Sequence, residues 1–177
     1  MNLEDNIITA NLILEPILPK HSEILFDSLQ SDELYTYIPQ NPPKSVNSLK
    51  DKYTKWSKRQ SSDNEEIWIN YAIYHKLKNI YVGTVQATIQ SNDTYIAYEV
   101  FPNYWKNGIA KEACNALIHF LFSNYSSKII KAHVDTRNKA SIGLLNSLGF
   151  KCIDKLLGAD EFKGSISDEF VYSIERK

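Results

Sequence analysis

One segment, Val100 to Ala113, constrains the fold more than any other, because it runs from a strand through a polar loop into a helix that starts at Gly108. The first backbone N–H groups of a helix have no acceptors within the helix, and they lie at the positive end of its dipole. A glycine at this point lets a phosphate approach these groups closely. The pattern therefore predicts an anion-binding turn or, as the structural alternative, a glycine that only eases entry into the helix.

Hydrophobic periodicity divides the rest of the chain into strands and helices. The clearest helix runs from Gly108 to about Tyr125 along one apolar stripe. Residues 35–45 contain three prolines and are expected to form a loop. The expected strands cover residues 11–15, 67–75, 81–90, 95–100, 128–135, 150–157 and 170–174, and the expected helices cover residues 24–29, 45–60, 108–125 and 138–148.

This order of elements predicts an α+β (mixed α/β) fold. The sheet is expected to be central, mixed and mostly antiparallel, with about seven strands and about four flanking helices. Three neighbouring strands form an antiparallel meander, and the strand–helix–strand units that follow add crossover connections. No flexible linker divides the 177 residues, so we expect residues 1–177 to form a single domain.

The charge balance and the cysteines exclude several classes of function. Twenty basic and 21 acidic residues give a net charge of -1, which lacks the basic excess of a nucleic-acid-binding protein. The first residues are acidic, and no apolar run approaches the roughly 18 residues of a membrane span, so we expect a cytoplasmic protein without a membrane partner. Cys114 and Cys152 lie far apart, which supports neither a disulfide scaffold nor a thiolate site. We expect no bound metal.

Four segments carry a resemblance to a known family: Thr9–Pro16, Tyr104–Ala113, Asn138–Ser141 and Leu148–Phe150. Together, in this order, they resemble the GNAT superfamily of N-acetyltransferases in its RimJ/RimL-like branch. The second segment is similar to the Tyr-Trp-Gly-x-Gly-Tyr-Ala-x-Glu-Ala of that branch, with Lys106 in the place of a glycine. Two arginines of the branch's opening segment are Asn11 and Glu15 here, so the roles of those arginines are not transferred.

The resemblance implies an acetyl-CoA site between two neighbouring strands that splay apart. The pantetheine arm would pair with residues 98–101, and the pyrophosphate would lie on the backbone of residues 105–110. Lys106 and Lys111 either add positive charge near the phosphates or are solvated. Asn138 caps the last helix, contacts the pantetheine arm, or does both. The implied cofactor-binding residues are Tyr98, Val100, Phe101, Trp105, Lys106, Asn107, Gly108, Ile109, Ala110, Lys111 and Asn138.

Acetyl transfer to an amine needs a base, a group that stabilises the oxyanion and a proton for the departing thiolate. An alkylammonium has a pKa near 10.4, so a carboxylate, or a water held by one, must remove its proton at neutral pH. The resemblance places Glu99 beside the thioester as this base; the alternative is a solvent-facing glutamate. Leu145 stands where many family members carry a tyrosine acid, so the resemblance implies Ser141 as the proton donor, the alternative being a serine bonded to the helix backbone. His133 and Asp135 form either a proton relay or a surface pair.

The acceptor is expected to be a primary amine. Tyr35, Tyr37 and Tyr98, together with a loop over residues 157–167, are the expected walls of its pocket. The proline-bearing loop over residues 35–43 is expected to help select the amine, because long loops with aromatic residues in compact domains tend to carry function. A peptide N-terminus, a polyamine and an amine-bearing antibiotic all fit, and both a monomer and a homodimer remain open. A second possible function is a non-catalytic acetyl-CoA-binding module that acts through protein partners. Only the enzyme would release free CoA when an amine is supplied.

Overall fold

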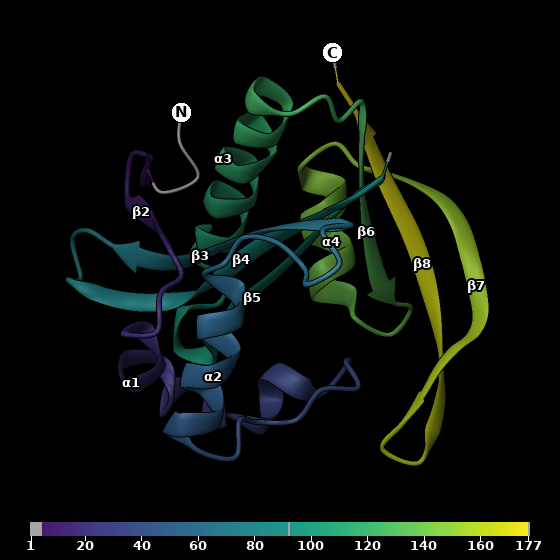
Figure 1. Ribbon diagram of the computed structural model, residues 1–177. Coiled ribbons are helices and arrows are strands. Elements are labelled where there is room, and N and C mark those ends of the chain that lie inside the picture. The colour runs from purple at the N-terminus through teal and green to yellow at the C-terminus, as the bar shows by residue number, and fades with distance from the viewer. Residues whose placement is uncertain (1–4, 92, 177) are drawn as a thin grey trace.

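The computed structural model describes residues 5–91 and 93–176, and these residues form one eight-stranded sheet in the order β1-β2-β3-β4-β5-β6-β8-β7 (Figure 1). The acidic start at residues 1–4 and Asn92, within a predicted connector, lie outside the described residues. The strands are β1 (Ile7–Ile8), β2 (Leu12–Pro16), β3 (Glu66–His75), β4 (Ile80–Gln90), β5 (Asp93–Val100), β6 (Ile129–Asp135), β7 (Lys151–Phe162) and β8 (Ser165–Glu175).

The sheet is mostly antiparallel, as predicted, and β5 with β6 is its parallel pair. The short β1 accounts for the strand beyond the predicted seven. The meander β3-β4-β5 is confirmed, and its strands approach closely at Gly83, where an added Cβ would lie 2.1 Å from the carbonyl oxygen of Glu99. A side chain at that position would push β4 away from β5.

Two of the four helices, α3 (Ile109–Asn124) and α4 (Lys139–Ser147), cover one face of the sheet (Figure 1). The predicted stripe of α3 is confirmed, since Ile109, Ala113 and Leu117 pack into the main core with residues of β2 to β6. Gly108 precedes the helix, as the sequence indicated. No helix in the described part of the chain has the length and apolar character needed to cross a membrane.

The other two helices, α1 (His21–Leu25) and α2 (Val46–Trp56), cover the opposite face and enclose a second, smaller core. A capping box formed by Ser45 and Ser48 starts α2, an arrangement that stabilises a helix by about 1 kcal/mol. The predicted continuation of this helix to residue 60 is wrong. Arg59 adopts a left-handed conformation, and Gln60 forms a β-bridge with Ile67 instead.

Two other predicted elements also differ from the structure. The helix over residues 24–29 is replaced by the earlier α1 and two 3-10 turns, η1 (Ser28–Gln30) and η2 (Asp32–Tyr35), and Ile24 is exposed. The loop over residues 157–167 is instead the end of a long hairpin, because β7 and β8 extend to a tight turn at Lys163 and Gly164. Nearly all of β7 is exposed, so its sequence lacks the alternation of apolar and polar residues that marks a half-buried strand.

Candidate active site

The two parallel strands β5 and β6 separate soon after they meet. Among the described residues, two pairs join them, Thr94 with Ile130 and Tyr95 with Lys131. Beyond these pairs β5 stays bonded to β4 and β6 stays bonded to β8, so their carboxyl ends diverge (Figure 1). The edges that face each other across this opening keep backbone groups available to an extended ligand.

The sheet face covered by α3 and α4 brings together three of the predicted residues. The hydroxyl of Tyr98 lies 2.7 Å from Oγ of Ser141, and the backbone N–H of Ser141 donates to Oδ1 of Asn138 at 3.0 Å. Asn138 is the N-cap of α4, which is one of its two expected roles. Burial raises the pKa of Tyr98, so its phenol remains protonated at neutral pH. A pair of hydroxyl groups therefore borders the opening on this side.

Glu99 lies on the opposite sheet face, where it is half-buried rather than fully exposed to solvent. Burial raises the pKa of its carboxyl group to about 6, while the positive charge of Lys52 on α2 acts in the other direction. The hydroxyl groups of Tyr35 and Tyr53 lie close enough for the charge of Glu99 to raise their pKa values further, beyond the effect of burial. A carboxyl group with a pKa near neutrality is suited to accept a proton from an amine.

The loop before α3 ends in a glycine with open space beside it. Gly108 has a φ of +75°, a left-handed conformation that glycine adopts without strain, and no atom lies within 4 Å of the place where its Cβ would be. Trp105 and Asn107 hold the loop through hydrogen bonds to the carbonyls of Val100 and Trp105, respectively. A surface cavity of about 340 Å³ adjoins the loop and is lined by Gly108, Lys111, Glu112, Asn115, Ser147 and Leu148.

The other residues that were predicted to bind the cofactor differ in how accessible their side chains are. Lys106 and Lys111 are exposed, whereas Ala110 is half-buried. Three of the predicted cofactor-binding side chains, those of Val100, Phe101 and Ile109, are buried in the two cores. Only their backbone groups are available to a ligand.

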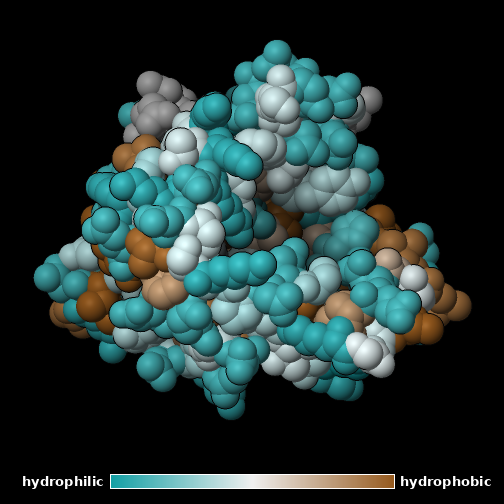
Figure 2. Space-filling model, turned by 60° about the horizontal axis from the view of Figure 1, so that its bottom comes forward, coloured by the Kyte–Doolittle hydropathy of each residue, from teal (hydrophilic) through white to brown (hydrophobic). Residues whose placement is uncertain are grey.

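The expected acceptor residues are divided between the core and the surface. Tyr35 is buried, and its hydroxyl donates to the carbonyl of Leu29 at 2.9 Å, whereas Tyr37 is partly exposed. Lys163, at the tip of the β7–β8 hairpin, donates to the carbonyl of Tyr35 and so ties the hairpin to η2. Figure 2 shows the molecule hollowed near the middle of the face that carries α2 and the hairpin tip, with hydrophobic atoms inside the hollow.

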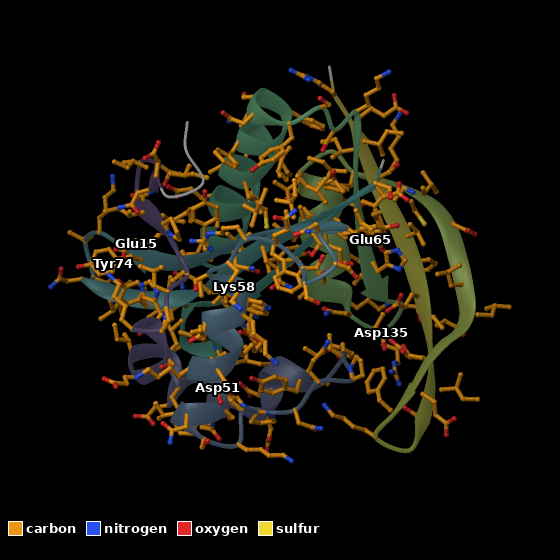
Figure 3. The ribbon with its side chains drawn as sticks, viewed as in Figure 1. Glu15, Asp51, Lys58, Glu65, Tyr74 and Asp135 are labelled. Atoms are coloured by element: carbon orange, nitrogen blue, oxygen red, sulfur yellow. The ribbon has the colours of Figure 1, made fainter. Side chains whose placement is uncertain are left out.

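A polar network at the end of β6 was not found from the sequence. Asp135, which is labelled in Figure 3, is buried. It accepts hydrogen bonds from Nε of Arg137 at 2.9 Å and from Oγ of Ser167 at 2.6 Å. The Arg137 guanidinium lowers the pKa of Asp135 to about 2. His133 instead contacts Glu169, with 3.0 Å between Nδ1 and Oε2. The two residues of the possible relay thus have separate partners.

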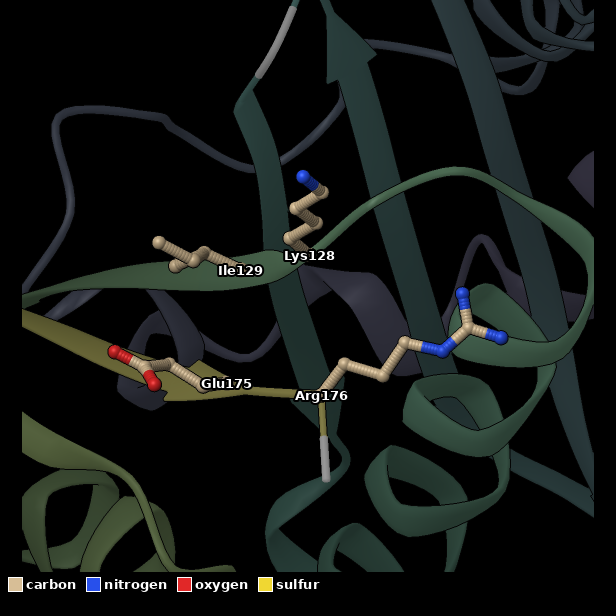
Figure 4. A pocket seen from close by; sticks show the side chains of 4 residues that line it. All are labelled: Lys128, Ile129, Glu175 and Arg176. Atoms are coloured by element: carbon tan, nitrogen blue, oxygen red, sulfur yellow. The ribbon is translucent and has the colours of Figure 1, made fainter.

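Another surface cavity, of about 510 Å³, lies at the opposite end of β6 (Figure 4). It is lined by Lys128, Ile129, Glu175 and Arg176, and it includes none of the predicted site residues. Within the described residues, no group of three or more His, Cys, Asp or Glu side chains is arranged to hold a metal ion.

Two curated proteins are similar to this chain in sequence. The uncharacterized N-acetyltransferase YoaA of Bacillus subtilis (strain 168) is 28% identical over 169 residues, which is 94% of each protein. The uncharacterized N-acetyltransferase p20 of Bacillus licheniformis is 34% identical over 82 residues, so that match spans about half of each protein, 46%.

Solved structures of acetyltransferases share the fold. The Salmonella typhimurium acetyl transferase described as modifying the N-terminal serine of ribosomal protein L7/L12 superposes with a TM-score of 0.84 at 16% identity, covering 98% of this chain and 100% of that one. The microcin C7 self-immunity acetyltransferase MccE, in complex with acetyl-CoA and AMP, gives a TM-score of 0.77 at 20% identity, covering 95% and 94%.

The family profile described as acetyltransferase (GNAT) domain matches residues 11–151. This range includes the opening between β5 and β6, the loop before α3 and the start of α4. The chain belongs to the GNAT acetyltransferase family and is an acyltransferase.

Proposed function

We propose that the protein is an acetyl-CoA-dependent N-acetyltransferase that transfers the acetyl group to a primary amine by direct attack in a ternary complex. The observation that carries the proposal is the opening between β5 and β6. It has a half-buried carboxyl group on one sheet face and a pair of hydroxyl groups on the other. Base and acid are thus available on opposite sides of one gap in the sheet.

The residues around this gap fit an elongated anionic thioester. The left-handed Gly108 and the first N–H groups of α3 suit a diphosphate, and Lys111 adds positive charge beside the adjoining cavity. The backbone of β5 from Tyr98 to Phe101 suits an amide-bearing arm, and one of its N–H groups can polarise the thioester carbonyl. Acetyl-CoA would supply the activated acetyl group.

Proton transfer is assigned to Glu99 and Ser141. With a pKa of about 6, Glu99 is mostly ionised at neutral pH and is more basic than an ordinary glutamate, so it can take the amine proton directly or through a water. The protonated phenol of Tyr98 can donate to Oγ of Ser141. In that arrangement the hydroxyl hydrogen of Ser141 is left to donate to the departing sulfur.

For the acceptor we favour an amine that projects from a larger molecule, such as a peptide N-terminus. The related Salmonella typhimurium enzyme is described as modifying an N-terminal serine, which supports this class. The hollow on the face that carries α2 and the hairpin tip offers room for such a molecule. Both cysteines are unpaired, which agrees with action in the cytoplasm.

The first prediction tests Glu99 as the base. Glu99→Gln should lower kcat by roughly 10²- to 10⁴-fold, because the neutral amide cannot accept the amine proton. In the wild type, kcat should fall as the pH drops through about 6, since only the ionised carboxylate is active. The variant should lack this acidic limb. The measurement is the release of CoA thiol against pH, with a panel of peptides and small amines as acceptors.

The exposed Glu175 on β8 provides the control, because Glu175→Gln removes an equal charge beside the start of β6, at the end of the strand away from the opening, and should leave the profile unchanged. Acetyl-CoA binding without thiol release across the whole panel would contradict an enzyme and favour a binding module. An acidic limb that survives in Glu99→Gln would assign the base to another group.

A further inference from the structure

We propose that Lys52 is the positive charge that keeps the Glu99 carboxylate ionised, and that it acts through Glu99 rather than on either substrate. This inference rests on the proposed function, because it concerns the same site and gives the base its electrostatic environment. Nothing in the sequence singled out Lys52, since a lysine on a polar helix is usually a solvated residue.

The fold places α2 over the row of strand residues that contains Glu99. Glu99 pairs with Thr84, and Thr84 pairs with Ala72, so the three residues lie side by side on one face of β5, β4 and β3. Ala72 packs with Tyr53 of α2 in the second core. Lys52 lies three residues after the buried Leu49 and four before Trp56, so it borders the face of α2 that packs on this row.

The side chain of Lys52 is held in place from within its own helix. Its Nζ lies 4.4 Å from the centre of the Trp56 ring, one turn further along α2, and Trp56 in turn stacks on Tyr53. A cation above an aromatic face is attracted by the ring, which restricts the otherwise flexible lysine. Tyr53 is almost fully buried, so this stack fixes the ammonium group relative to the sheet.

The Lys52 charge acts on Glu99 without occupying its oxygens. Between these two described residues there is no N–O contact within 4.0 Å, so they do not form a closed ion pair. A close ion pair would occupy part of the acceptor capacity of the carboxylate and lower its pKa further, which would make it a poorer base. A cation at longer range lowers the energy of the ionised form and leaves the lone pairs free for an incoming amine.

The other titratable groups that face Glu99 are neutral near pH 7. They are Tyr53 of α2 and Tyr35 of η2, and burial raises the pKa of both phenols. Burial alone would raise the pKa of Glu99 further, and Lys52 opposes that rise. The influence is mutual, because Glu99 also opposes the lowering of the Lys52 pKa by burial. Lys52 is thus the counter-charge of the base.

The test is a direct titration of Glu99 in the ligand-free protein by NMR of ¹³C-labelled glutamate carboxyl groups, with the signal assigned from Glu99→Gln. Lys52→Met should raise the midpoint of the Glu99 titration by at least about half a pH unit, but by less than the loss of a close ion pair would. Lys52→Arg should restore the wild-type midpoint. Lys50→Met is the matched control, because it removes the same charge from the far side of the same helix. A midpoint unchanged in Lys52→Met would overturn the proposal.

A second measurement separates this inference from the proposed function. If Glu99 is the base, the acidic limb of kcat should move upward in Lys52→Met by the same amount as the NMR midpoint. If the NMR midpoint moves and the kinetic limb does not, the role of Lys52 stands and Glu99 is not the base. Because the titration needs no substrate, an inactive preparation can still overturn the role of Lys52.

Discussion

Ser141 has two expected roles, one in the structure of α4 through its backbone and one in proton transfer through its hydroxyl group. Its backbone N–H donates to the side-chain oxygen of Asn138, which caps α4, and its hydroxyl contacts Tyr98 on β5. Removing the hydroxyl leaves the cap in place, because the cap uses only the backbone. A substitution at this residue therefore tests chemistry with little effect on the helix.

We predict that Ser141→Ala lowers turnover and spares the affinity for acetyl-CoA. A CoA-type thiol is a fairly good leaving group, with a reference pKa of about 8.5, so assistance by an acid should not exceed the roughly 10²- to 10⁴-fold typical of positioned proton transfer. Calorimetry and single-turnover rates measure the two quantities. Tyr98→Phe should show a smaller loss, since it removes only the partner of Ser141. Wild-type turnover in Ser141→Ala, with chemistry limiting the rate, would point to water as the acid.

At the scale of elements, Glu112 in the first turn of α3 connects this helix to the turn between β1 and β2. Its carboxylate accepts hydrogen bonds from Oγ1 of Thr9 at 2.6 Å, the backbone N–H of Asn11 at 2.7 Å and Nδ2 of Asn11 at 2.9 Å. Partial burial opposes ionisation, but these hydrogen bonds outweigh it and lower the pKa of Glu112. Asn11 stands where the family branch has an arginine, and its backbone N–H and side-chain amide both donate to this carboxylate.

We predict that Glu112→Gln destabilises the protein by roughly 1 kcal/mol at pH 7, a value reduced for the partial exposure of the group. Because the folded-state pKa is lowered, the stabilisation is complete above the unfolded-state pKa near 4.3 and disappears as the pH falls below it. Urea unfolding at pH 7 and at pH 3 measures the difference. Glu23→Gln, on the exposed side of α1, should have no such effect. An equal loss at both pH values would argue against a charge effect.

Periodicity predicted the elements that bury one continuous stripe, and it failed where burial is incomplete. α3 and the meander β3-β4-β5 each present a regular apolar face to the core, and both were predicted closely. The exposed β7 has no such face, so its first half was predicted as the strand over residues 150–157 but its continuation to Phe162 was not. α1 is a single turn whose buried residues include His21 and Ser22, and hydrophobic periodicity gives no clear signal for so short a helix.

The candidate site was predictable where it depends on local backbone and not where it depends on distant contacts. The Gly108 turn could be recognised because its residues are consecutive. The contact between Tyr98 and Ser141 joins residues 43 positions apart, and the effect of Lys52 on Glu99 depends on how α2 crosses the sheet. Such arrangements follow from tertiary packing, which a single sequence does not specify residue by residue.

At the scale of the whole molecule, the sheet consists of two halves with a weak junction. Two residue pairs connect β5 to β6 among the described residues, while the main core joins the halves through α3. A further connection runs from Lys163 at the hairpin tip to Tyr35. The gap between the halves is therefore surrounded by ordered structure although its own edges lack backbone partners.

We predict that acetyl-CoA slows amide exchange chiefly at residues 96–101, 105–110 and 132–135, where the ligand would supply the missing partners. At 100 times its Kd the ligand should also raise the free energy of unfolding by about 2.7 kcal/mol. Hydrogen exchange followed by mass spectrometry and thermal unfolding measure these effects. Gly108→Trp should abolish both, because the side chain fills the turn and strains its left-handed backbone. Protection confined to β2 and β3 would place the ligand elsewhere.

The long outer strand β7 ends the sheet, and its hydrogen-bonded register with β8 shifts between Cys152 and Asp154 and again between Leu156 and Asp160. Ile153 and Leu157, which lie at these interruptions, are exposed. A straight edge strand of twelve residues would offer a regular template to another copy of the chain, whereas an irregular one breaks the ladder after a few bonds. The consequence is protection from open-ended aggregation: the protein can expose hydrophobic side chains at this border because its backbone does not support the growth of a continuous intermolecular sheet.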